Sequence, residues 1–155
     1  MQIFLLFFII LISCSPVDSK LESVSLPQYE VISFDAVEKE FIINTELPKN
    51  VASQLKYWLS EKVKISGYEG SLIITIDRYE EIVSNIEDGK RVDASLSFKA
   101  IINTPSLSKT QTIEGSVSSY GTLTGIFSLA EFDTIIKNTQ SDLILRLSRD
   151  LKSKI

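Results

Sequence analysis

The chain has 155 residues, and its 16 lysines and arginines against 20 aspartates and glutamates give a net charge of −4. It contains no histidine and one cysteine, which excludes histidine-based catalytic triads, histidine metal sites and thiolate zinc clusters. The acidic balance offers no surplus for nucleic acid, and no glycine motif for a dinucleotide or a phosphate is present. We therefore expect no enzyme activity, no catalytic residues, no metal, no cofactor and no nucleic-acid partner. Asp77 and Glu80 could form an acid–base pair, but a solvated strand edge is the better interpretation.

The amino-terminal segment is an unbroken apolar run over residues 3–12, followed by the only cysteine. A run of about ten residues is too short to cross a bilayer, which takes roughly 20, but it suits the apolar region of a signal peptide. The sequence Leu11-Ile12-Ser13-Cys14 resembles the lipobox of bacterial lipoproteins. That resemblance implies a signal peptide over residues 1–13, cleavage between Ser13 and Cys14, and lipid attached to the Cys14 thiol. A plain signal peptide is the alternative.

The next segment, residues 14–27, is polar and predicts a lipidated tether, which leaves residues 28–155 as a single domain. The domain opens with residues 29–45, which are rich in β-branched and aromatic side chains. This composition predicts one long or interrupted strand with a break near Asp35 and Ala36.

A first helix is predicted after Pro48, because proline suits the first turn of a helix, where its missing N–H costs nothing. Apolar residues then recur at helical spacing at Val51, Ala52, Leu55, Trp58, Leu59 and Val63. Gly67 is the expected end of the helix. The stripe could be a ligand-binding face, but packing against a sheet is the favoured interpretation.

Three strands are predicted next. Residues 71–77 are apolar on both faces and indicate a strand inside the sheet. From Val92 to Asn103 apolar and polar residues alternate, and residues 110–119 place Ile113, Gly115 and Val117 on one face. We predict a three-residue loop at Glu87-Asp88-Gly89, because this register keeps carboxylates off the core face. It sets opposite each other Ile74 and Ile102, Ile76 and Ala100, and Ile82 and Ala94.

The last predicted element is a long helix. Ser128 and Glu131 have the spacing of a capping box, and Phe127 and Phe132 are placed to form a hydrophobic staple around it. An apolar stripe follows at Phe132, Ile135, Ile136, Leu143, Ile144, Leu147 and Leu151. The cations near its end, Arg146, Arg149, Lys152 and Lys154, could bind anionic lipid heads, but complementing the helix dipole is the favoured role.

These elements follow the order β-α-β-β-β-α. Two amphipathic helices must cover one sheet face to bury their stripes, so the predicted fold is an α+β two-layer sandwich with a mostly antiparallel sheet. Together with the lipobox, this order resembles the lipopolysaccharide-assembly outer-membrane lipoprotein family (LptE-type). The residues that carry the resemblance are the hairpin Glu87-Asp88-Gly89-Lys90, Ser119-Tyr120, and the closing segments 127–131 and 143–147.

The resemblance implies a function. It implies a lipid-anchored protein on the periplasmic side of the outer membrane that helps lipopolysaccharide assembly as a plug or partner of a β-barrel. Lys90 and Arg91, on the hairpin, would be the candidate contacts to the partner or to lipid. The alternatives are an auxiliary lipoprotein of an ABC-type lipid transporter and a non-catalytic envelope scaffold.

Overall fold

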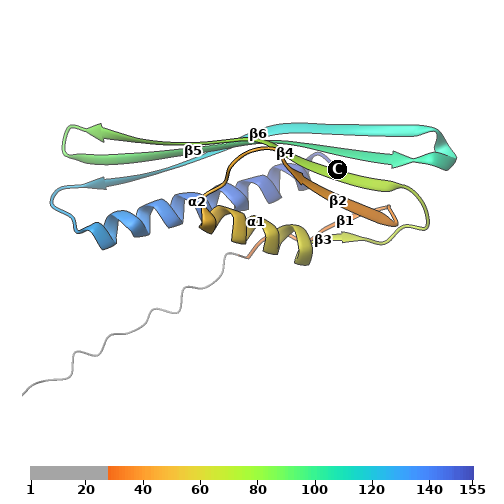
Figure 1. The fold of residues 1–155 in the computed structure, drawn as a ribbon, viewed down its shortest axis with the longest axis horizontal. Helices are drawn as coiled ribbons and strands as arrows, with labels where there is room; N and C mark the ends of the chain where they lie inside the picture. Colours follow the sequence, from red (N-terminus) through yellow and green to blue (C-terminus); the bar gives the residue numbers. More distant parts are fainter. Residues whose placement is uncertain (1–27) are drawn as a thin grey trace, which may run out of the picture.

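The computed structural model describes residues 28–155, so the predicted signal peptide and tether, with Ser13 and Cys14, lie outside the described residues. The elements of the fold follow one another along the chain as Figure 1 shows. In chain order they are β1 (Ile32–Phe34), β2 (Glu38–Ile43), α1 (Lys49–Glu61), β3 (Val63–Ile65), β4 (Ser71–Ile86), β5 (Gly89–Thr104), a 3-10 turn (Pro105–Leu107), β6 (Lys109–Thr124) and α2 (Leu129–Ser153).

The main sheet has the strand order β2-β4-β5-β6, with β2 parallel to β4 and the other neighbours antiparallel. Both helices lie on one face of this sheet (Figure 1). The predicted α+β two-layer sandwich is therefore confirmed, and so is the placement of residues 71–77 inside the sheet. The break predicted near Asp35 separates β1 from β2.

A small second sheet was not predicted. The first helix ends at Glu61 and not at Gly67, because Val63 to Ile65 form β3, which pairs in parallel with β1. Val63 is fully buried from this strand, and β-branched residues such as Val63 and Ile65 are enriched in strands. Gly67 has another role: a Cβ at this position would lie 2.5 Å from the backbone nitrogen of Ala36.

The register between β4 and β5 differs from the predicted one. Ile86 pairs with Gly89, so the hairpin turns on two residues, Glu87 and Asp88. A bulge between Ile76 and Arg78 then shifts the pairing further along the strands, so that Ile74 faces Ala100 and Ile76 faces Phe98.

The bulge also changes which residues of β4 face the helices. Glu81 now stands opposite Ala94, and Ile82 lies on the other face with 60% of its surface exposed. The predicted register avoided a carboxylate on the helix side, but Glu81 is accepted there because it receives hydrogen bonds. The Tyr79 hydroxyl donates to its carboxylate at 2.5 Å, and the Gln140 amide donates at 2.8 Å.

The core lies between the sheet and the helices. The stripe of α1 is buried as predicted, and so are the alternate residues of β5 from Val92 to Ala100. The carboxyl-terminal half of α2 supplies Leu143, Ile144, Leu147 and Leu151, each fully buried, whereas Phe132, Ile135 and Ile136 are half-buried. Gly121 lets α2 approach β6 closely, since a Cβ there would lie 2.5 Å from the Thr139 hydroxyl oxygen.

The start of α2 has the predicted geometry. The Ser128 hydroxyl accepts a hydrogen bond from the Glu131 backbone N–H at 3.2 Å, and the Glu131 carboxylate accepts one from the Ser128 backbone N–H at 2.7 Å. The rings of Phe127 and Phe132 stack with their centroids 6.2 Å apart. Both the capping box and the hydrophobic staple are therefore confirmed.

Candidate functional site

The two candidate cations of the hairpin lie on opposite faces of the sheet. Side chains alternate along β5, so Lys90 shares the helix side with Val92, while Arg91 points to the outer face. The Lys90 ammonium lies 3.0 Å from the side-chain oxygen of Asn85 and 5.9 Å from the ring centroid of Phe132 in α2. The hairpin therefore packs against the helix layer through Lys90, and the two cations that were expected to share one contact surface do not form one binding pair.

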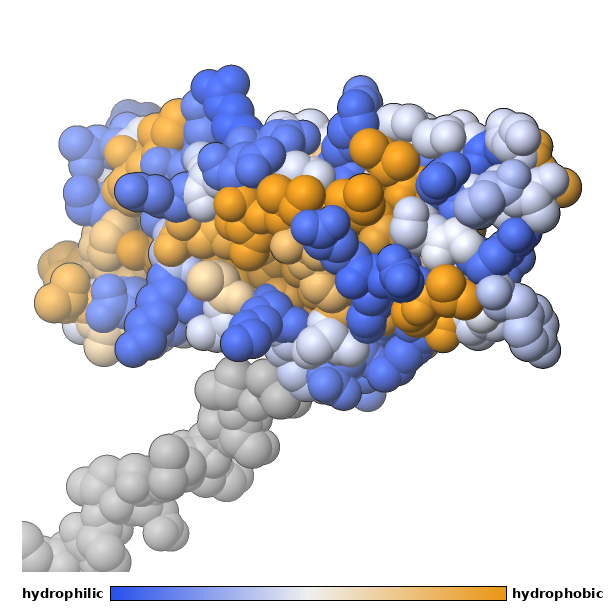
Figure 2. Space-filling view, turned by 45° about the vertical axis from the view of Figure 1, so that its right-hand side comes forward, coloured by the Kyte–Doolittle hydropathy of each residue, from blue (hydrophilic) through white to orange (hydrophobic). Residues whose placement is uncertain are grey.

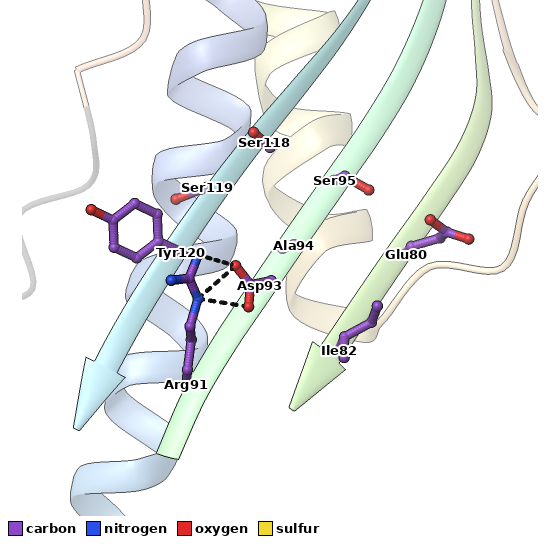
Figure 3. Close-up of a pocket in the computed structure, with 9 residues that line it drawn as sticks. All are labelled: Glu80, Ile82, Arg91, Asp93, Ala94, Ser95, Ser118, Ser119 and Tyr120. Carbon is purple, nitrogen blue, oxygen red and sulfur yellow. Dashed lines mark hydrogen bonds and ion pairs between the residues drawn. The ribbon is translucent and has the colours of Figure 1, made fainter. Parts of the chain in front are cut away.

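Arg91 belongs to a shallow pocket on the outer face of the sheet (Figure 3). Three strands supply its lining, which consists of Glu80, Ile82, Arg91, Asp93, Ala94, Ser95, Ser118, Ser119 and Tyr120. Residues at every second position of neighbouring strands meet on one face of a sheet, and this periodicity brings the outward-facing members of the set together.

Arg91 is held in place by two neighbours. Its guanidinium donates to both carboxylate oxygens of Asp93, with distances of 2.7 to 2.9 Å. The same group lies 4.5 Å from the ring centroid of Tyr120, which is itself 64% exposed. Arginine is well suited to such stacking because its charge is spread over a planar group.

The ion pair also fixes the charge of the site. The hydrogen bond from Arg91 holds the pKa of the Asp93 carboxyl below its ordinary value, so Asp93 is ionised at neutral pH. The hydrogen bonds from Arg91 to Asp93 use Nε and one terminal nitrogen, which leaves the second terminal nitrogen free of Asp93. A guanidinium with a free edge, an exposed ring and the hydroxyls of Ser95 and Ser118 form a surface suited to a phosphorylated or sugar-like group.

The carboxylates considered for acid–base chemistry do not form a pair. Asp77 lies at the bulge and accepts a hydrogen bond from the Asn44 amide at 3.4 Å, whereas Glu80 is paired with Arg78. Both belong to solvated surface, as the favoured interpretation had it. Within residues 28–155, no cluster of three or more acidic, histidine or cysteine side chains could hold a metal ion.

The cations of α2 are mostly paired with acids. Arg146 is 2.6 Å from Asp142, Lys152 is 2.6 Å from Glu30, and Lys154 is 2.7 Å from Asp150. The Asp142 pKa is lowered: burial acts to raise it, but the hydrogen bonds from Arg146 and Ser119 outweigh that effect. Among the residues that the structure describes, Arg149 forms no ion pair within 4 Å.

A second hollow lies at the β2 edge of the sandwich, between the sheet and α1. It is lined by Phe41, Ile43, Ala52, Lys56, Leu59 and Ser60. Figure 2 shows apolar surface gathered across the middle of the molecule, bordered by hydrophilic side chains. The hollow beside β2 differs from the outer pocket, because its lining is mainly apolar, whereas the outer pocket is lined by charged groups and hydroxyls.

Sequence reasoning found Arg91 but missed the groups that surround it. Asp93 and Ser95 were recognisable as outward-facing members of the same alternation. Tyr120 was noted only as part of a serine–tyrosine strand end, and its pairing with Asp93 depends on the β5–β6 register. The turn from Pro105 to Ser108 joins β5 to β6. The alternation of apolar and polar residues predicts which face each side chain takes, but no equally strong local signal predicts which residues of the two strands stand opposite each other.

No protein-family model matches the sequence, and no curated protein matches it. Among solved structures, a minor lipoprotein from Acinetobacter baumannii superposes with a TM-score of 0.52 at 11% identity, covering 76% of this chain and 91% of that one. Rare lipoprotein B from Shewanella oneidensis superposes with a TM-score of 0.45, also at 11% identity, covering 76% and 97% of the two chains. The Acinetobacter match shows that this fold also occurs in a bacterial lipoprotein.

None of the helices among the described residues combines the length and the apolar character that a membrane crossing requires.

Proposed function

We propose that this chain is a lipid-anchored envelope protein that assists lipopolysaccharide assembly at the outer membrane as a partner or plug of a β-barrel. The observation that carries the proposal is the outer sheet face, where Arg91 lies on Tyr120 beside serine hydroxyls. The lipobox-like sequence ending at Cys14 and the fold shared with a bacterial lipoprotein support it.

In this proposal the protein works through a surface. Two or more acyl chains on Cys14 would hold it at the membrane, since each buried CH₂ contributes about 0.8 kcal/mol. Lipopolysaccharide carries phosphate and sugar groups. Arg91 would donate to phosphate, Ser95 and Ser118 would bond to sugar hydroxyls, and the exposed side chain of Ile82 would contact the barrel wall or an acyl chain.

The two neighbouring cations provide a matched test. Arg91→Glu should make cells permeable to a large antibiotic, because it places a second carboxylate beside Asp93 and removes the phosphate donor. Lys90→Glu makes the same charge change on the opposite sheet face and should leave resistance intact. Both variants should keep normal protein levels and melting temperatures, because both side chains are at the surface. Full resistance with Arg91→Glu would show that the outer face is not the working surface.

Crosslinking identifies the partner class. A photo-reactive phenylalanine derivative in place of Tyr120 should capture a large outer-membrane β-barrel or lipopolysaccharide, and the same group in place of Tyr57, on α1, should not. Capture of a permease or a tethered solute-binding protein from position 120 would instead support the auxiliary lipoprotein of an ABC-type transporter.

A further inference from the structure

The strand β6 is a long sheet edge whose middle and carboxyl-terminal part lack the usual protection. It ends the four-stranded sheet, runs for 16 residues, and pairs with β5 without a register shift. Between Thr110 and Thr124 its only charged residue is Glu114. Exposed edges are normally guarded by charges, prolines, bulges or shortness, because their free backbone groups bind other strands. The opposite edge, β2, has six residues and carries Glu38, Lys39 and Glu40.

The free backbone groups of β6 belong to its even-numbered residues. The Gly125 N–H donates to the Asp88 carbonyl at 2.7 Å, while Thr124 stands opposite Gly89. Pairs in an antiparallel ladder alternate, so the odd-numbered residues bond to β5 and the even-numbered ones point to the edge. The Glu114 carbonyl is an example of such an edge group: it accepts a hydrogen bond from the Lys154 ammonium at 3.1 Å, on the side away from β5.

Two arginines flank the middle of this edge on the helix side. A groove between β6 and α2 is lined by Val117, Ser118, Arg146, Arg149, Asp150 and Ser153. Asp150 forms an ion pair with Lys154, and Arg146 forms one with Asp142. Arg149 is exposed and forms no ion pair within 4 Å in the described part of the chain. A strand added to β6 would therefore place its helix-facing side chains beside a positive charge.

We propose that β6 binds an extended segment of a partner protein by strand addition, and that this segment carries acidic side chains on its helix-facing side. Backbone hydrogen bonds would supply the pairing, and Arg149 with Arg146 would select the acidic residues. A second copy of this chain is a poor occupant. Pairing β6 with itself about its middle would bring the arginines of both α2 helices together, and the helix-facing residues of β6 near its middle, Ile113, Gly115, Val117 and Ser119, include no acid.

This edge adjoins the outer-face surface of the proposed function, since Ser118 lines both. The inference does not rest on that function, because the edge is read by the β6 backbone and Arg149, whereas the outer face is read by Arg91. The test uses the mature lipidated protein in lipid nanodiscs and a fluorescent peptide of sequence KTVTETETVTK, whose two glutamates lie on one strand face. Fluorescence anisotropy should show binding. Affinity should fall about tenfold or more when both glutamates become glutamine, because the charge pairs are lost. Methyl groups on the backbone nitrogens of the pairing edge should abolish binding.

Variants of the protein complete the design. Arg149→Glu should reduce binding of the acidic peptide as strongly as the glutamine peptide does. Lys137→Glu makes the same charge change outside the groove and should not, and Arg91→Glu should not either. Equal binding of the acidic, glutamine and methylated peptides would overturn the proposal. So would a stable dimer of the mature protein that Ser116→Cys locks by a disulfide, since the edge would then be occupied by a second copy.

Discussion

At the scale of single residues, a chain of half-buried polar side chains around the buried Gln140 links the layers. Glu81 on β4 accepts from Tyr79 and from Gln140 on α2, and the Asn50 amide on α1 donates to the Gln140 oxygen at 2.9 Å. Burial and the hydrogen bond to Glu81 raise the pKa of the Tyr79 hydroxyl, which stays a donor at any physiological pH. Because the Glu81 carboxylate has hydrogen-bond donors on the helix side, its partial burial does not oppose folding.

Gln140→Leu should lower the free energy of unfolding by about 1–3 kcal/mol. Gln140 is 4% exposed, and the change removes a donor from Glu81 and an acceptor from Asn50. Urea unfolding of the variant measures the loss. A double variant with Glu81→Leu should recover part of the stability, because it removes the abandoned carboxylate. An unchanged urea midpoint in the single variant would mean that the network contributes nothing.

Cys14→Ala should abolish lipid attachment and leave the precursor uncut. The reason is chemical, since the thiol at this position is the only one in the chain that could carry the lipid. Labelling cells with a radioactive fatty acid measures the attachment, and Ser15→Ala serves as a neighbouring control that should be labelled normally. Equal labelling of Cys14→Ala and the parent would contradict the lipoprotein assignment.

At the scale of elements, periodicity predicted the strands and helices, but not how they pair. The alternation from Val92 and the carboxyl-terminal half of the α2 stripe appear in the structure as buried faces. The β4–β5 register was wrong for two reasons: the hairpin turns on two residues and not three, and a bulge follows at Asp77, which no nearby glycine or proline indicates. A carboxylate on the helix side was predicted to be unfavourable, but Glu81 has a partner there, Gln140, which lies 59 residues away in sequence. Arg91 was predicted as a site residue, but its contact with the Tyr120 ring joins two strands and is equally non-local.

The capping box of α2 gives an element-scale prediction. Ser128→Ala should lower the free energy of unfolding by about 1 kcal/mol at neutral pH, as loss of an N-cap usually does. The backbone hydrogen bond from Ser128 lowers the pKa of Glu131, whose ordinary value is 4.5. A carboxyl whose pKa is lower in the folded state stabilises the fold above its unfolded pKa, and this contribution is lost as the pH falls through the folded value.

Urea unfolding at several pH values tests this. The parent should lose the contribution of Glu131 as the pH falls below about 4.5, and Glu131→Gln should lack that part of the pH dependence. Asp133 lies two residues further along α2 and takes no part in the capping box, so Asp133→Asn serves as the control. A parent and a Glu131→Gln variant with identical pH profiles would contradict the capping role.

At the scale of the whole molecule, the described chain begins on the helix layer and leaves the outer sheet face clear. The Tyr29 hydroxyl donates to Gln54 of α1 at 2.5 Å, and Glu30 pairs with Lys152 of α2. Burial, with a contribution from Tyr57, raises the pKa of Tyr29 to about 12, so this contact keeps its proton. The outer sheet face therefore lies on the side of the sheet away from the first described residues (Figure 1), so it and the β6 edge could meet different partners at once.

This division of surfaces requires a domain that is stable by itself, which gives the last prediction. A chain beginning at Lys20 should fold without metal or cofactor, because its core holds large side chains that are fully buried from both layers, among them Trp58, Phe98 and Leu143. Circular dichroism and a cooperative thermal melt, unchanged by a chelator, measure this. Leu143→Asp should unfold that chain, since it buries a charge with no partner, whereas Asn138→Asp adds the same charge to the exposed side of α2 and should melt normally. An unfolded chain that metal restores would show that the sheet and two helices do not stabilise the domain unaided.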